Sequence, residues 1–115
     1  MLPLTNRLKK TTEISKVFKE GRFFKEGFLI LKTAKNNLNK SRFGFIVSQK
    51  ISKKAVLRNK IKRRLRAIVG KELKTIKTGT DNLVVALPGL EKKDFSSTKE
   101  TLNNLIKKAK LINEQ

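Results

Sequence analysis

The chain has 115 residues, and its 29 lysines and arginines against 9 acidic residues give a formal net charge of +20 at pH 7. It contains no cysteine, which excludes disulfide bonds and thiolate metal sites. The length predicts a single domain over residues 1–115, and the lack of a signal-like or membrane-length apolar run predicts a cytoplasmic protein without a membrane partner.

The first half of the sequence predicts one helix followed by strands. Three apolar residues have the i, i+3, i+4 spacing of a helix face: Ile14, Val17 and Phe18. We expect Thr11 or Thr12 to cap this helix and Gly21 to end it in a left-handed turn. Residues 27–34 and 42–48 are typical of strands, the first with an extension back to residues 22–24. We expect these two strands to form a hairpin across the asparagine-rich turn between them.

The second half predicts a helix, a short strand and a final helix. The first of these helices starts near residues 52–54 and stops around Gly70 or one turn beyond it, and the strand lies in residues 82–89. Ser97 and Glu100 have the spacing of a capping box. An apolar stripe follows: Leu102, Leu105, Ile106, Ala109 and Ile112. The order predicts an α/β protein, an α+β two-layer sandwich with helices against a small sheet.

The helix in the middle of the chain carries the strongest functional signal. Residues 58–66 hold six basic side chains, and residues 27–71 hold 14 basic residues and no acidic one. An apolar stripe of Leu57, Ile61, Leu65 and Ile68 predicts that the helix also packs on a core. Like charges one helical turn apart repel one another. Phosphates would turn the same rows into charge-assisted contacts, so we predict a nucleic-acid-binding protein.

Two stretches resemble the bacterial ribonuclease P protein subunit. The run "RNKIKRRLR" at residues 58–66 looks like the "RNR" signature of that family, and it follows "FGFIVSQK" at residues 43–50 as it does there. The segment "NRLKKTTEISKVFKEGRFF" at residues 6–24 is similar to the start of the family's proteins. The resemblance extends from about Arg7 to Ile112, over nearly the whole chain.

The resemblance implies a fold and a function. The fold is an αβββαβα arrangement around a small central sheet, with a left-handed βαβ crossover. Such a protein is the non-catalytic subunit of a tRNA 5′-maturation endoribonuclease, a hydrolase whose RNA subunit carries the chemistry with Mg²⁺. The implied partners are the catalytic RNA and the 5′ leader of precursor tRNA, and the protein is expected to be monomeric apart from the RNA complex.

The resemblance also assigns roles to individual residues. Those expected to contact the RNA subunit are Arg58, Asn59, Lys60, Lys62, Arg63 and Arg66. Those expected in the leader-binding cleft are Phe18, Ile14, Leu31 and Lys50. The family often has an aromatic residue at the position of Ile14 and another at or near Leu31. We therefore expect fewer stacking faces in this cleft. No catalytic or metal-binding residue is assigned to the protein itself.

Other functions remain open from the residues alone. A ribosomal or other structural RNA-binding protein has the same size and charge, and only the order of the motifs argues against it. A self-sufficient nuclease is disfavoured because the chain has no histidine or cysteine and no acidic pair within the basic region. On spacing alone, Phe18 belongs to a core rather than to a ligand site.

Overall fold

The computed structural model describes residues 2–109 and residue 111. Its helices and strands follow one another in the predicted αβββαβα order: α1 (Thr11–Glu20), β1 (Arg22–Glu26), β2 (Leu29–Lys35), β3 (Arg42–Val47), α2 (Ala55–Glu72), β4 (Thr80–Ala86) and α3 (Phe95–Lys108). Short 3₁₀ turns lie at Leu4–Asn6, Leu73–Thr75 and Leu90–Lys92. The α/β class and the element order expected from the sequence are confirmed.

The sheet has the strand order β1-β2-β4-β3, so the predicted hairpin of β2 and β3 is wrong. The strand β4 lies between them, antiparallel to β2 and parallel to β3. Five of its seven residues are buried, which suits the centre of a sheet covered on both faces. The hairpin instead joins β1 to β2 through Gly27, whose φ of 56° favours glycine. The left-handed sense of the crossover from β3 through α2 to β4 stays a prediction.

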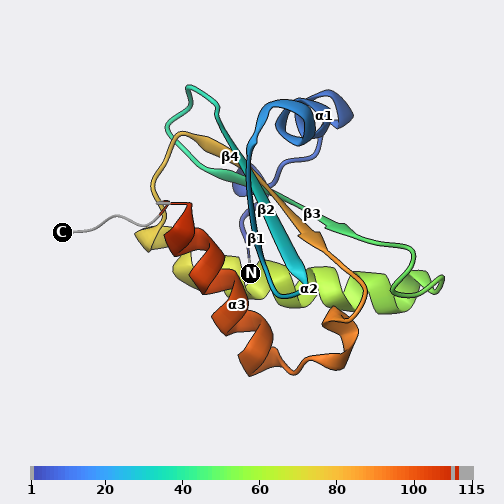
Figure 1. Ribbon diagram of the computed structural model, residues 1–115. Helices are drawn as coiled ribbons and strands as arrows, with labels where there is room; N and C mark the ends of the chain where they lie inside the picture. Colours follow the sequence, from blue (N-terminus) through green and yellow to red (C-terminus); the bar gives the residue numbers. More distant parts are fainter. Residues whose placement is uncertain (1, 110, 112–115) are drawn as a thin grey trace.

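Helices cover the two faces of the sheet unequally. The main core lies between the sheet and the pair α2 and α3, where Leu31, Phe43 and Val84 are buried. The helix α1 lies on the other side of the sheet, away from α2 and α3 (Figure 1). There, Val17 packs with Leu83 and a few neighbours in a smaller cluster. The predicted two-layer sandwich thus describes the main core, and α1 adds a partial cover to the second face.

The apolar stripes predicted for α2 and α3 face the main core. On α2 the buried residues are Ile61, Leu65, Ile68 and Val69, while Leu57 is partly buried. On α3 the stripe is buried as far as Ala109, and the predicted contribution of Ile112 lies outside the described residues. The predicted capping box at Ser97 is wrong, because α3 begins earlier. Its N-cap is Asp94, whose Oδ1 accepts a 2.8 Å hydrogen bond from the Ser97 amide.

The ends of α1 also differ from the expectation. The helix begins at Thr11 and has no side-chain cap, because Thr11 is already its first residue and Lys10 is the N-cap. Gly21 ends it with extended backbone (φ −68°, ψ 151°) rather than a left-handed turn. Glycine is needed there for space, since a Cβ atom would lie 2.5 Å from the carbonyl oxygen of Val17.

An ion network ties α1 to the sheet. On β3, the guanidinium of Arg42 donates two hydrogen bonds to the carboxylate of Asp81 on β4, at 2.8 and 2.7 Å. A third, at 2.8 Å, reaches Glu13 in the first turn of α1. The hydrogen bonds that Arg42 donates to Asp81, followed by the one that it donates to Glu13, raise the pKa of Arg42 against the opposing effect of burial. One side chain therefore joins α1, β3 and β4.

Candidate nucleic-acid interface

The basic residues of α2 do not form one uniform surface. Asn59 and Arg63 are exposed, whereas Arg58, Lys62 and Arg66 are half-buried. The side chain of Arg58 makes a contact within the protein: its Nη1 donates a 2.9 Å hydrogen bond to the carbonyl oxygen of Ser52. That contact orders the loop leading into α2.

Three of the predicted RNA-binding residues line one concave surface. Asn59, Arg63 and Arg66 surround an open depression together with Val56. Two guanidinium groups beside an amide match the acceptors of a phosphate backbone, because a guanidinium donates to two oxygens at once. We call these four residues the outer surface of α2.

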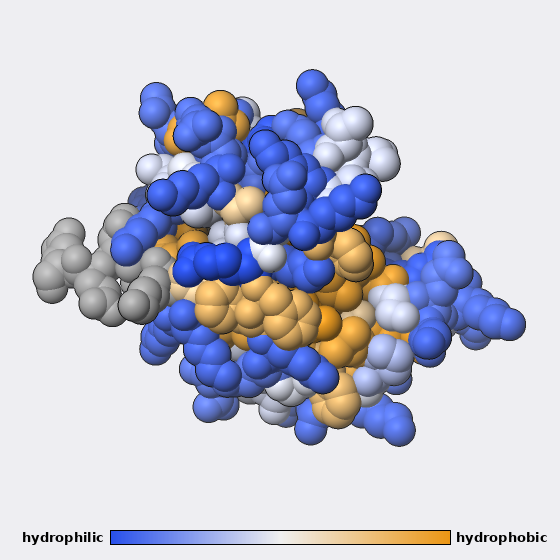
Figure 2. Space-filling view, turned by 45° about the horizontal axis from the view of Figure 1, so that its top comes forward, coloured by the Kyte–Doolittle hydropathy of each residue, from blue (hydrophilic) through white to orange (hydrophobic). Residues whose placement is uncertain are grey.

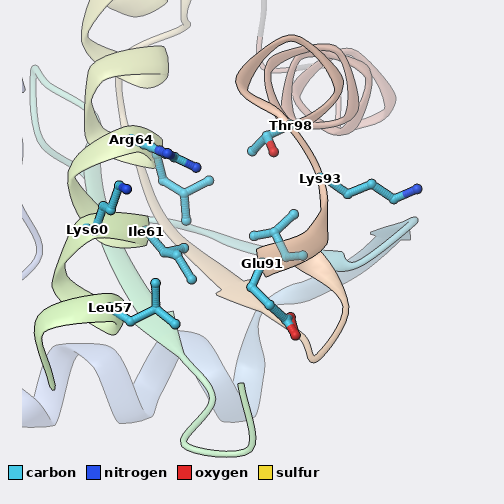
Figure 3. A pocket seen from close by; sticks show the side chains of 9 residues that line it. Leu57, Lys60, Ile61, Arg64, Glu91, Lys93 and Thr98 are labelled. Atoms are coloured by element: carbon cyan, nitrogen blue, oxygen red, sulfur yellow. The ribbon is translucent and has the colours of Figure 1, made fainter. Parts of the chain in front are cut away.

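Lys60 lies on a different side of the same helix. It borders a pocket of about 130 Å³ between α2 and the segment leading into α3 (Figure 3). Four leucine or isoleucine side chains, one threonine and four charged side chains line it: Leu57, Ile61, Leu65, Leu90, Thr98, Lys60, Arg64, Glu91 and Lys93. In Figure 3, the side chains of Leu57 and Ile61 extend from α2 towards that segment. The structure therefore separates Lys60 from the outer surface of α2.

On the opposite face of the sheet, Phe18 is exposed rather than part of the core. Its exposed fraction is 51%, which excludes the core role that its spacing favours. The ammonium of Lys32 lies 4.0 Å from the centroid of its ring. The same Nζ donates a 2.7 Å hydrogen bond to the carbonyl oxygen of Phe18. Ile14, one turn earlier on α1, is partly buried against the small cluster around Val17.

The prediction that Leu31 lines the cleft is wrong. Leu31 is completely buried among the residues that face α2 and α3. Side chains alternate between the two faces along a strand, so the neighbouring residue Lys32 is the one that faces α1. Lys50 is exposed, in the loop that follows β3.

Sequence reasoning missed Lys32 and also Phe23. On the edge strand β1, Phe23 is directly opposite Lys32 in the β1–β2 register. It is 57% exposed, and its ring centroid lies 5.9 Å from Lys32 Nζ. Two signals were available: a lysine directly after the apolar run of residues 28–31, and adjacent phenylalanines, of which an edge strand turns one outward. Figure 2 shows hydrophilic side chains over most of one side of the molecule, with a band of apolar side chains across its middle.

The described part of the chain offers little for metal-dependent chemistry of its own. Across residues 2–109 and residue 111, no three histidine, cysteine or acidic side chains gather as a metal site would need. Within the same residues, no helix has the length and apolar character to cross a membrane. The fold and these surfaces define a small basic α/β protein with a cationic helix on one side and exposed rings beside a lysine on the other, features that RNA-binding proteins use.

Comparison with known proteins identifies the family. The model of the ribonuclease P family matches residues 2–110. The ribonuclease P protein component of Pseudanabaena sp. (strain PCC 6903) is 35% identical over 113 residues, covering 97% of each chain. That of Syntrophomonas wolfei is 38% identical over 112 residues, covering 97% of this chain and 93% of the relative.

Solved structures agree with this assignment. The ribonuclease P protein of Staphylococcus aureus superposes with a TM-score of 0.86 at 28% identity, covering 94% of this chain and 98% of that one. The protein from Thermotoga maritima gives a TM-score of 0.81 at 32% identity, covering 89% and 96%. The chain belongs to the family of ribonuclease P protein components, the protein subunits of a tRNA-processing ribonuclease.

Proposed function

We propose that this subunit binds the catalytic RNA through α2 and the 5′ leader of precursor tRNA through the face that carries α1. The observation that carries the first half is the outer surface of α2, where Asn59, Arg63 and Arg66 converge. Each guanidinium there is suited to a bidentate phosphate contact. The helix is held on the core by its buried stripe, so the backbone that carries these donors is already positioned before RNA arrives.

The second half rests on the exposed ring of Phe18. Single-stranded RNA is recognised by aromatic rings that stack on unpaired bases and by cations that contact its backbone. Phe18 and Lys32 supply one of each, 4.0 Å apart. The tRNA body is largely double-helical, whereas a leader offers unpaired bases. The combination therefore favours the leader as the segment bound here.

The RNA subunit is proposed to carry out the hydrolysis with Mg²⁺. Cleavage of a phosphodiester requires a general acid and base or metal ions held at the bond. The sequence contains no histidine and no cysteine, and its central basic region contains no acidic residue to hold a metal. In this proposal the protein contributes substrate affinity and favours the active fold of the RNA.

Reconstitution tests the proposal. A bacterial ribonuclease P RNA is incubated with precursor tRNA at low Mg²⁺, with and without the protein, and release of the leader is followed. We expect faster release with the protein, and no specific cleavage by the protein without RNA. A mixture that cleaves no faster than the RNA alone would favour the alternative, a structural RNA-binding protein. Specific cleavage at the mature 5′ end by the protein alone would contradict the division of labour.

A further inference from the structure

Two exposed phenylalanines from different elements flank a single lysine on the face that carries α1. Phe18 comes from α1 and Phe23 from the edge strand β1, and each leaves about half of its side chain in solvent. The ammonium of Lys32 lies 4.0 Å from one ring centroid and 5.9 Å from the other. A single exposed aromatic side chain is unremarkable on a protein surface, but two that share one cation form a defined arrangement.

The position of the cation is set by the backbone. Lys32 lies opposite Phe23 in the β1–β2 register, and its Nζ donates a 2.7 Å hydrogen bond to the carbonyl oxygen of Phe18. A lysine ammonium has three N–H donors, so two remain for another acceptor. Attraction between the cation and the two rings holds the three groups together without a ligand. The ordering cost of binding is thereby reduced.

The chemistry of the arrangement matches a short piece of single-stranded RNA. Bases stack on aromatic rings whatever their sequence, and a cation between two rings meets the phosphate that joins two bases. We propose that Phe18, Lys32 and Phe23 form one site for two consecutive unpaired nucleotides of the leader. One base stacks on Phe18, the next stacks on Phe23, and Lys32 binds the phosphate between them. The inference rests on the proposed leader binding, adds Phe23 to it and assigns one particular phosphate to Lys32.

The arrangement explains how this cleft works with few aromatic residues. Ile14 and Leu31 supply no ring, and Leu31 is buried on the far face of the sheet. Phe23 supplies a second ring from the sheet edge, and Lys32 supplies a contact between its charge and a phosphate in place of a further stacking face. Binding here is accordingly expected to tolerate changes of leader sequence and to depend on salt, because a phosphate contact releases counterions.

The test measures the affinity of the reconstituted holoenzyme for precursor tRNA and for mature tRNA. In Phe23→Ala we expect about 5-fold weaker binding of precursor, the low end for loss of one base–aromatic stack, and unchanged binding of mature tRNA. Phe23→Leu should lose as much, because leucine restores apolar area but no ring face. Phe95→Ala is the matched control, since Phe95 is 40% exposed at the start of α3, which packs on the other face of the sheet.

Lys32→Gln probes the phosphate. We expect the slope of log affinity against log salt for precursor to decrease by about 0.7, the value for one contact to a single strand. The fluorescent base 2-aminopurine is placed in turn at two adjacent leader positions. In the wild-type holoenzyme, stacking on Phe18 should quench its fluorescence at one position, and stacking on Phe23 should quench it at the other. Each alanine variant should restore the fluorescence at one position only.

The outcomes separate the inference from the function on which it rests. If wild-type holoenzyme binds precursor no better than mature tRNA, leader binding itself is wrong. If it prefers precursor, but Phe23→Ala equals Phe95→Ala or Phe23→Leu restores binding, the two-nucleotide site is wrong. Thermal unfolding of each variant reports any loss of fold, and the binding of mature tRNA provides a second check.

Discussion

Replacing Arg42 by methionine should destabilise the protein severely. Methionine preserves most of the apolar stem and removes only the guanidinium, whose three hydrogen bonds join β3 to Asp81 on β4 and to Glu13 on α1. The carboxylate of Asp81 would keep one donor, Nδ2 of Asn36, at 2.8 Å. It would lose the positive charge that balances it.

The expected cost follows from the burial of the pair. Breaking a buried ion pair costs about 3–5 kcal/mol, because an uncompensated charge remains. The side chains of Arg42 and Asp81 retain 17% and 11% of their exposure, so solvent offsets part of this penalty. We therefore expect a loss of about 3 kcal/mol, the lower end of that range. For a chain of this length the loss corresponds to a melting temperature lower by about 12 °C.

Denaturant and thermal unfolding at pH 7 provide the measurement. Arg63→Met is the matched control, since Arg63 is exposed on α2 and its loss should change stability by less than about 0.5 kcal/mol. Glu13→Gln should lie between the two, because the amide oxygen still accepts from Arg42 while the charge is gone. A loss below about 1 kcal/mol in Arg42→Met would refute the reasoning, since the network would then contribute no more than a surface pair.

Three further outcomes are expected. Phe18→Ala should cost less than about 2 kcal/mol of stability, because half of the ring is already in solvent. It should weaken leader-dependent binding by about 1–3 kcal/mol. A large loss of stability without a change in leader binding would return Phe18 to the core. Replacing Arg63 and Arg66 together by alanine should weaken binding to the RNA subunit and reduce the slope of log affinity against log salt. Both effects should be larger than for the same change at Lys99 and Lys107 on α3. Equal losses would mean that net charge governs affinity. Asp94→Ala should lower the melting temperature at pH 7. Hydrogen bonds from Ser97 hold the pKa of Asp94 below its ordinary 3.8, so the cap stabilises the fold above that pH. The difference from wild type should shrink as the pH falls through the folded-state pKa, and a constant difference would exclude the ionised cap.

The sequence predicted the positions of the helices and strands better than it predicted which strands pair. Periodicity identified the stripes of α2 and α3, because each buries one continuous face. Strand pairing was harder, since residues 27–34 and 42–48 follow one another and a hairpin is the shortest connection. The apolar run in β4, buried on both faces, is what places that strand at the centre of the sheet. A prediction that weighed burial above proximity would have placed it there.

The candidate site was predictable in type and only partly in detail. The "RNR" resemblance located the basic helix, and helical periodicity already places Lys60 and Arg63 on different sides of it, as the structure confirms. In β2 both Leu29 and Leu31 are apolar, and so is Ile30 between them, so apolar character alone does not reveal which residue faces α1. Alternation along the strand turns Lys32 towards α1 once Leu29 and Leu31 are buried in the main core, but its contact with Phe18 joins two separate elements. Pairwise contacts of this kind need the three-dimensional structure.

Because β4 lies at the centre of the sheet, the sheet cannot be completed on the ribosome before β4 has been synthesised. The strands β1, β2 and β3 emerge before β4, and until residues 80–86 leave the exit tunnel β2 pairs only with β1 and β3 has no strand partner. Until then the chain carries two strand edges without their partner, and its most basic segment is already synthesised. The last residue of β4 is synthesised only when about three quarters of the chain has been made, and the sheet closes after that, once β4 has left the tunnel. A shortened protein that ends before β4 would keep the basic helix α2 but lose the complete sheet on which that helix packs.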